Sequence, residues 1–181
     1  FAKKKYQAAG DAYQIYSEKS RNAKLTDRFY AGFSYYFAFT VEDAKNIKDP
    51  KAPRTDSALL VKADSAFSYV IQKAGSNAPP ITFVYRARID DLHETDRNNI
   101  QRLAKPFYEK FIEVALAKGP PTEDRIKNNL VEAYDYLGTY AEFKEKDEAK
   151  AAENFNKAKE IDPTDKQALD YFKRKSGGKS R

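Results

Sequence analysis

Residues 134–163 read YDYLGTYAEFKEKDEAKAAENFNKAKEIDP, and this stretch carries the pattern that predicts the fold. In its first half Gly138 follows Tyr134 by four residues, and in its second half Phe155 follows Ala151 by four. Residues four apart on a helix lie on the same face, and a glycine or alanine lets a second helix approach closely. The stretch therefore predicts two antiparallel helices that pack through small residues.

The same spacing recurs along the whole chain. A first helix with a small residue is expected at Arg28-x2-Ala31-Gly32, Phe83-x2-Arg86-Ala87 and Tyr134-x2-Leu137-Gly138. The second helix of a pair is expected to carry an alanine, an aromatic residue four positions later and a packing residue three positions after that. This pattern occurs at Ala9…Tyr13…Tyr16, Ala63…Phe67…Val70, Ala104…Tyr108…Phe111 and Ala151…Phe155…Ala158. Each hairpin leaves an apolar side that only a neighbour can cover, which predicts stacked repeats. The alternative is an irregular helical bundle in which such spacings arise by chance.

Helical signals dominate the rest of the sequence, and the alternation typical of strands is nearly absent. We predict helices over residues 2–19, 26–45, 56–74, 80–92, 100–118, 123–144 and 147–161, and a short last helix from Thr164. Tyr6, Ala9, Ala12, Tyr13 and Tyr16 share one side of the first helix. We predict one domain over residues 1–175 and a flexible basic tail over residues 176–181.

Several residues are expected to mark where helices begin and end. Thr26 and Asp27 are candidate caps of the second helix, and Gly75 is a candidate stop for the third. Pro106 must lie in the first turn of its helix or kink it. The spacing of Thr164 and Gln167 fits a capping box for the last helix.

With these motifs in place, the sequence resembles the tetratricopeptide repeat (TPR) family. The run from Tyr134 through Leu137-Gly138, Ala151, Phe155 and Pro163 is close to the family pattern W-x2-L-G…A-x3-F…P. The resemblance implies an all-α fold, a right-handed α-solenoid of about three helix hairpins, with an N-terminal half-repeat helix and a C-terminal capping helix. The earlier pairs lack the closing proline, and the repeats are longer than the family period of about 34 residues. We therefore expect divergent repeats.

The resemblance also implies a concave face built from the first helices of the pairs. Helical offsets place Phe29, Tyr30, Phe33, Tyr36, Val84, Tyr85, Arg88, Asp135, Tyr136 and Thr139 on that face. From these we select Tyr30, Phe33, Tyr85, Arg88 and Tyr136 as the partner-binding residues, because tyrosine offers apolar area and a hydroxyl at low entropy cost. Aromatic side chains at this spacing also pack between hairpins, so exposed and packed arrangements both remain open.

Some TPR domains hold the C-terminal carboxylate of a peptide with Lys, Arg and Asn on the concave face. The matching positions in this chain carry Phe29, Phe33, Asp135 and Tyr136, and Arg88 is the cation nearby. We therefore expect no carboxylate clamp of that kind.

The positive charge is concentrated at the C-terminal end. The formal net charge is +6, and residues 171–181 contain five cations and no acid, so the remainder is close to neutral. Phosphate-backbone binding needs several cations that act together along a surface. We therefore expect no nucleic-acid partner, and docking of the basic tail on an anionic surface is a weaker alternative.

The residue content excludes several kinds of active site. The chain has no cysteine and one histidine, His93, which lies in a polar run with acids on both sides. Cysteine-ligated metals, thiolate nucleophiles and multi-histidine centres are therefore excluded within these residues, and no nucleophile elbow or phosphate-binding glycine loop occurs. We expect no enzyme activity, no cofactor and no metal. No run approaches the length of a membrane span.

The sequence thus predicts a non-enzymatic scaffold that binds a segment of a partner protein in the concave groove, as one part of a longer chain or assembly. The alternative is a ligand-binding module whose exposed aromatics stack on glycans. The location stays unknown, although the resemblance to divergent bacterial TPR proteins suggests the periplasm or cell envelope. The chain begins with Phe1 and contains no methionine, so we interpret it as a processed or excised piece.

Overall fold

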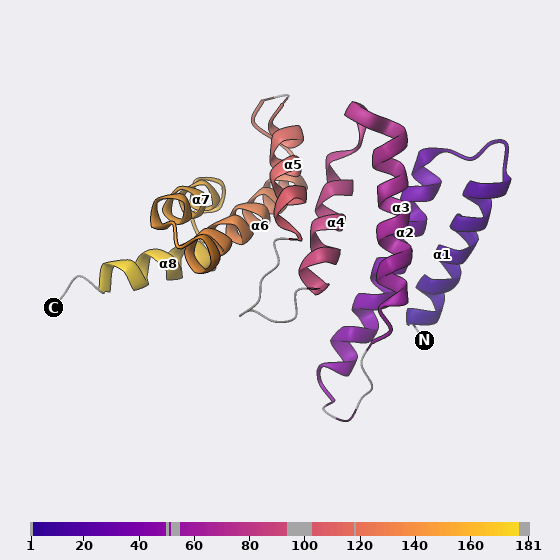
Figure 1. Cartoon of the computed structure of the whole chain (residues 1–181), viewed down its shortest axis with the longest axis horizontal. Coiled ribbons are helices and arrows are strands. Elements are labelled where there is room, and N and C mark those ends of the chain that lie inside the picture. The colour runs from indigo at the N-terminus through magenta and orange to yellow at the C-terminus, as the bar shows by residue number, and fades with distance from the viewer. Residues whose placement is uncertain (1, 50, 52–54, 94–102, 118, 178–181) are drawn as a thin grey trace. The chain divides into compact units, whose positions relative to one another are not determined.

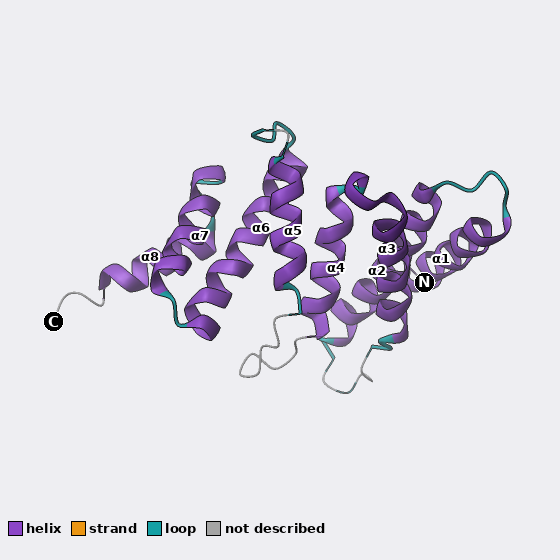
Figure 2. Ribbon diagram, turned by 45° about the horizontal axis from the view of Figure 1, so that its top comes forward, coloured by secondary structure: helices purple, strands orange, loops and turns teal. Residues whose placement is uncertain are grey.

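The computed structural model describes residues 2–49, 51, 55–93, 103–117 and 119–177. These residues are helical with connecting turns, and they contain no strand. The α-helices are α1 (Ala2–Lys19), α2 (Leu25–Asn46), α3 (Ala58–Ala74), α4 (Pro80–His93), α5 (Lys105–Leu116), α6 (Asp124–Tyr140), α7 (Glu148–Ile161) and α8 (Lys166–Gly177) (Figures 1 and 2). A 3-10 turn (Gly75–Asn77) follows α3, and a π-helical turn (Ala141–Glu145) follows α6. The predicted all-α class is confirmed for the described residues.

The chain forms two compact units, residues 1–92 and residues 93–181. In the first unit α2 packs against α1 on one side and against α3 on the other. In the second unit α6 packs against α5 and α7, and α7 packs against α8. Within each unit, helices that are consecutive in the sequence are therefore neighbours in space, as a helical repeat requires.

The core of the first unit is built where the small residues of α2 meet α3. Ala31, Ala63 and Phe67 are each 0% exposed. A Cβ atom added at Gly32 would lie 3.0 Å from the ring of Phe67, so the glycine is what lets this ring sit against α2. The predicted contact between a small residue of the first helix and an aromatic of the second is thus present in the first unit.

The second unit repeats this contact with different residues. A Cβ atom at Gly138 of α6 would lie 2.9 Å from the ring of Phe155 on α7. The Phe155 ring also stacks on Tyr171 of α8, with ring centroids 4.5 Å apart. Ala151 and Ala158, one turn to either side of Phe155, are both 0% exposed.

Several predicted helix ends are correct. Gly75 ends α3 with a φ of 56°, and its N–H donates to the carbonyl of Ile71. Pro106 lies in the first turn of α5, where a missing N–H leaves no intrahelical bond unmade. The Asp27 carboxylate accepts from the backbone N–H of Lys24 at 2.7 Å and so caps α2, whereas Thr26 lies within the first turn.

Other predicted helix ends differ from the structure. The cap of α8 is Asp165, whose Oδ2 accepts from the backbone N–H of Ala168 at 2.7 Å. Thr164 lies one residue too early for that role, because α8 begins at Lys166, and its hydroxyl donates to Asp162 at 2.7 Å. The α5 helix begins at Lys105 rather than near residue 100. The helix predicted over residues 123–144 does continue to Glu145, but its geometry is π-helical after Tyr140. Ser176 and Gly177 belong to α8, and the rest of the predicted tail lies outside the described residues.

Candidate interaction surface

A cluster of aromatic side chains lies along one side of α2 in the first unit. Phe29, Phe33 and Phe37 follow one another at intervals of four residues, so they stack along a single helical face. The ring centroids of Phe29 and Phe33 are 6.2 Å apart, and those of Phe33 and Phe37 are 4.6 Å apart. All three side chains are half-buried, which leaves part of each ring at the surface.

Four of the five predicted site residues meet in this cluster. The Phe33 ring lies 5.5 Å from that of Tyr85 on α4, and the guanidinium of Arg88 lies 5.4 Å from the centroid of the same tyrosine. The ring centroids of Tyr30 and Phe29 are 5.9 Å apart, and Tyr30 is 48% exposed. The fifth residue, Tyr136, belongs to the second unit, where its ring lies 4.9 Å from that of Tyr108 on α5.

Tyr85 supports the cluster from inside the core. It is 4% exposed, and its ring stacks on Phe67 with centroids 5.3 Å apart and planes 8° apart. The sequence left open whether this tyrosine is exposed or packed, and in the structure it is packed. Val84 and Asp135, which the helical offsets also placed on the concave face, are 0% and 4% exposed, so that part of the prediction is wrong.

Two tyrosines of α1 extend the cluster, and sequence analysis did not select them as site residues. The Tyr6 ring lies 5.9 Å from Phe37, and the Tyr13 ring lies 5.5 Å from Tyr30. Tyr6 is 38% exposed and Tyr13 is 37% exposed. The sequence signal that could have selected them is that both lie on one side of the helix predicted over residues 2–19. We call Tyr6, Tyr13, Tyr30, Phe33 and Phe37 the aromatic surface.

An open groove of about 490 Å³ lies elsewhere on the first unit, between α1 and α3. Its lining consists of Asp11, Gln14, Ile15, Arg28, Tyr35, Val61, Lys62 and Ser65. Asp11 accepts from the Tyr35 hydroxyl at 2.8 Å and pairs with Lys62 at 3.2 Å, while Arg28 pairs with Glu18 at 2.9 Å. Burial raises the pKa of Tyr35, so this hydroxyl stays protonated. The charged side chains of the groove thus already have partners of opposite charge, which does not suit a charged ligand.

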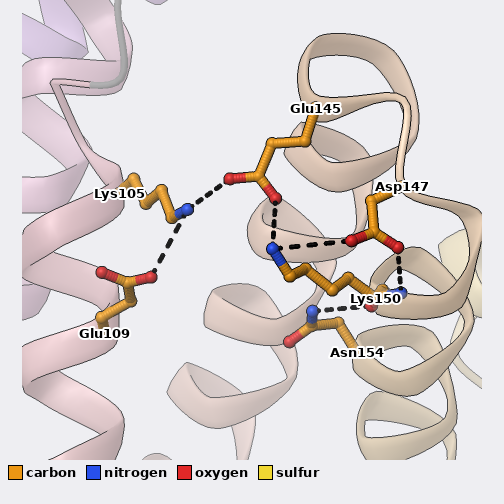
Figure 3. A network of polar contacts seen from close by, with 6 residues as sticks. All are labelled: Lys105, Glu109, Glu145, Asp147, Lys150 and Asn154. Carbon is orange, nitrogen blue, oxygen red and sulfur yellow. Dashed lines mark hydrogen bonds and ion pairs between the residues drawn. The ribbon is translucent and has the colours of Figure 1, made fainter.

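A network of ion pairs holds α5 to the turn between α6 and α7 in the second unit (Figure 3). The ammonium group of Lys105 lies 2.6 Å from Glu145 and 3.6 Å from Glu109. Lys150 lies 3.4 Å from the second oxygen of Glu145 and 3.5 Å from Asp147. The hydrogen bond from Lys105 lowers the pKa of Glu145 below its usual range. Each charge in the network has an opposite partner, so its role is structural.

Much of the basic excess at the C-terminal end is also paired. Arg174 of α8 lies 2.8 Å from Glu142, and Lys175 lies 2.9 Å from Glu148. These acids come from the π-helical turn and the start of α7, so the pairs fasten α8 to the second unit. Docking of Arg174 and Lys175 on an anionic surface would have to compete with these contacts, and the cations of the predicted tail, Lys179 and Arg181, lie outside the described residues.

Asp135 of α6 is the buried acid of the second unit. Its Oδ1 is buried, with no hydrogen-bond partner among the described residues. Burial, reinforced by the negative charge of Asp165 and a hydrogen bond to it, raises the pKa of Asp135 from 3.8 to about 7. Desolvation disfavours the charged carboxylate, and a neighbouring acid adds to that effect. The side chain therefore takes up a proton as the chain folds at mildly acidic pH.

This pKa shift predicts that stability falls as the pH rises from about 4 to about 7, because the folded state binds more protons than the unfolded state in that window. The Asp135→Asn variant cannot lose a proton, so we expect it to flatten this dependence. At about pH 8 it should be about 1–2 kcal/mol more stable than the parent chain, below the ceiling set by the full shift. Urea unfolding at about pH 5 and about pH 8 measures the difference. Asp170→Asn, at an exposed site on α8, is the control, and an equal response of both variants would contradict the prediction.

No catalytic arrangement accompanies these features in the part of the chain that the structure describes. His93 is the exposed last residue of α4, and the predicted loop that follows it lies outside the described residues. The described residues contain no group of three or more side chains suited to hold a metal ion. None of their helices combines the length and the apolar character needed to cross a membrane.

No protein-family model, no curated protein and no solved structure matches this chain. The resemblance to the TPR family therefore depends on the quoted motifs and on the packing of their residues. Among the described residues the structure establishes an all-helical architecture, and within each compact unit consecutive helices pack against one another. Small residues of a first helix contact aromatics of the second in both units.

Proposed function

We propose that the chain is a non-enzymatic scaffold of the TPR type, and that its aromatic surface binds a segment of a partner protein. The observation that carries the proposal is the exposure of aromatic side chains that pack on one another. Tyr30 is 48% exposed, Tyr6 is 38% exposed and Tyr13 is 37% exposed, all around the half-buried rings of Phe33 and Phe37. A contiguous exposed apolar patch on a protein marks an interaction site more often than scattered apolar residues do.

The chemistry of this surface suits a peptide segment. Tyrosine and phenylalanine supply large contact areas at a low cost in side-chain entropy, and tyrosine adds a hydroxyl for hydrogen bonds. The rings are also held in place, because Phe29 and Phe33 contact Tyr85, which stacks on the fully buried Phe67. A partner would therefore meet a preorganised surface, which reduces the entropy lost on binding.

A recurring contact between helices supports the repeat interpretation. Three of the four second-helix aromatics meet a tyrosine at the same position of the next helix: Tyr13 meets Tyr30, Phe67 meets Tyr85, and Tyr108 meets Tyr136, with ring centroids 5.5, 5.3 and 4.9 Å apart. Equivalent contacts in successive pairs favour divergent TPR units that continue as one right-handed solenoid.

Affinity capture with the folded chain tests the proposal. The Tyr30→Ala and Phe33→Ala double variant should recover partner proteins about tenfold less efficiently than the parent chain, because it removes the centre of the aromatic surface. Tyr69→Ala is the matched control, since Tyr69 is a 40% exposed tyrosine on α3 outside this surface. Circular dichroism verifies that both variants are folded. Equal recovery of the same proteins by all three chains would refute the assignment.

Glycan binding is the second candidate, because exposed tyrosine rings such as Tyr30 and Tyr13 are also suited to stack on sugars. A glycan array separates the two, since a glycan-binding module should retain a defined set of sugars and lose them in Tyr30→Ala. Absence of binding across the array would leave the protein-binding proposal alone. A periplasmic or envelope location remains a prediction from the resemblance.

A further inference from the structure

The N-terminal end of α8 meets the rest of the second unit through two acids. Asp165 directly precedes the helix and caps it, since its Oδ2 accepts from the backbone N–H of Ala168 at 2.7 Å. The same side chain is hydrogen-bonded to Asp135 of α6, which is 4% exposed. Ionised carboxylates only accept hydrogen bonds, so two of them can share one only if a carboxyl carries a proton. The contact between α6 and the start of α8 therefore requires a proton.

The other charged groups that act most strongly on Asp135 are also acids. Glu132 lies one turn earlier on α6 and accepts from the Tyr108 hydroxyl of α5 at 2.8 Å. Asp162 lies at the end of α7, and its hydrogen bonds from Thr164 lower the pKa of this carboxyl, so it stays ionised. The Oδ1 atom of Asp135 is buried with no hydrogen-bond partner among the described residues. Loss of the shared proton would thus create a buried negative charge beside other acids, which is unfavourable.

The C-terminal end of α8 is held by a different kind of contact. Arg174 lies 2.8 Å from Glu142, and Lys175 lies 2.9 Å from Glu148. The hydrogen bond from Lys175 lowers the pKa of Glu148, so this carboxylate is already charged at mildly acidic pH. The ion pair of Lys175 therefore persists at the pH values at which Asp135 loses its proton, and the two ends of α8 respond differently to pH.

We propose that the docking of α8 is pH-dependent: a proton shared by Asp135 and Asp165 holds its N-terminal end against α6, and loss of that proton to solvent releases this end. Release separates the two acids and lets water reach both carboxylates. The ion pairs at the other end keep the helix attached to the second unit. The part of α7 that becomes accessible is the ring of Phe155, which is 2% exposed while it stacks on Tyr171.

The direction of the pH effect follows from which state holds the proton. Burial and the neighbouring acids raise the pKa of Asp135 from 3.8 to about 7, so at intermediate pH the docked state is protonated and the released state is ionised. Release therefore becomes more favourable as the pH rises through this window and changes no further above about pH 7. Each pH unit contributes at most about a factor of ten, so the ceiling between about pH 5 and about pH 7 is about 100-fold.

Hydrogen exchange of backbone amides, corrected for the intrinsic effect of pH on exchange, measures the release. A helix of 12 residues is marginal in water on its own, so the released end should lose its internal hydrogen bonds. We expect the protection of residues 169–173 to fall about tenfold between about pH 5 and about pH 7.5, below the ceiling, while that of α6 changes less. Asp135→Asn cannot lose a proton and should remove the difference. Asp170→Asn, at an exposed site on α8, is the matched control and should retain it.

A second variant and a second measurement address the pair directly. Asp165→Asn keeps a side chain that can cap α8 but removes one carboxyl of the pair, so it should also abolish the difference. Carbon-13 NMR of the side-chain carboxyls should show Asp135 titrating at about pH 7 in the parent chain. Circular dichroism verifies that each variant is folded.

Four results would overturn the proposal. The first is equal protection of α8 at both pH values, and the second is titration of Asp135 at about pH 4, as in an exposed carboxyl. The third is a fall in protection that persists in Asp135→Asn. The fourth is an equal fall in α6 and α8, because the second unit would then unfold as a whole. None of these measurements involves the aromatic surface of the first unit, so their outcome is independent of the partner-binding proposal.

Discussion

Gly138→Leu is expected to lower the free energy of unfolding by about 3 kcal/mol, because the new side chain has no room between α6 and α7. The first atom of that side chain, Cβ, would already lie 2.9 Å from the Phe155 ring. The ring has little room to move away, since it is 2% exposed and also stacks on Tyr171, with ring centroids 4.5 Å apart. Chemical denaturation monitored by circular dichroism measures the loss.

Gly138→Ala tests the same close approach of the helices with a smaller side chain. Alanine in place of glycine within an exposed helix stabilises by about 1 kcal/mol, whereas here we expect a net loss. Trimming the ring in the double variant Gly138→Ala with Phe155→Leu should recover part of that loss, which a double-mutant cycle detects. Gly177→Ala is the control, since nothing lies within 4 Å of a Cβ atom at that position. A Gly138→Ala variant more stable than the parent would contradict the close approach.

The positions of the second-helix aromatics could be predicted from the sequence because spacing alone decides them. An alanine and an aromatic four residues apart share a helical face whatever surrounds the helix. Phe67, Tyr108 and Phe155 are accordingly 0%, 2% and 2% exposed, each on the expected side. Local sequence was therefore sufficient to predict burial of an aromatic wherever a neighbouring helix covers that face.

The same rule could not say which side of α1 is covered. The row of Tyr6, Tyr13 and Tyr16 was expected to lie along one side, and it does, but these side chains are 38%, 37% and 46% exposed. The helix packs on α2 through Gly10, a residue with no side chain to reveal a packing face. Burial is a property of the neighbour as well as of the helix, so spacing within one helix cannot settle it.

The burial of Asp135 is a second property that spacing within one helix could not predict. Helical offsets placed it on a face with Tyr136 and Thr139, yet it is 4% exposed, and the charge of Asp165 just before α8 acts on it. The residues that influence it lie in a turn about thirty positions later in the chain. An acid would not be expected in a core, since burial of a charge is unfavourable, and its raised pKa is how the fold accommodates it.

Phe67→Ala is expected to destabilise the chain by about 4 kcal/mol, because it leaves a large cavity at the centre of the first unit. Phe67 is 0% exposed, and the centroid of its ring lies 5.5 Å from that of Phe29 and 5.3 Å from that of Tyr85. Phe67→Leu retains most of the volume and should cost about 1.5 kcal/mol or less. Val61→Ala, at a 59% exposed site on the same helix, should be nearly neutral.

The packing of Phe67 also connects the core to the proposed function. Phe67 supports Tyr85 and Phe29, and those rings in turn contact Phe33. A smaller side chain at position 67 should therefore let the rings of the aromatic surface move more freely while the chain is still folded. Partner capture by Phe67→Leu, at a temperature where it remains folded, should therefore fall while capture by Val61→Ala does not. If Phe67→Leu captured partners as well as the parent chain, binding would not depend on the preorganisation of these rings.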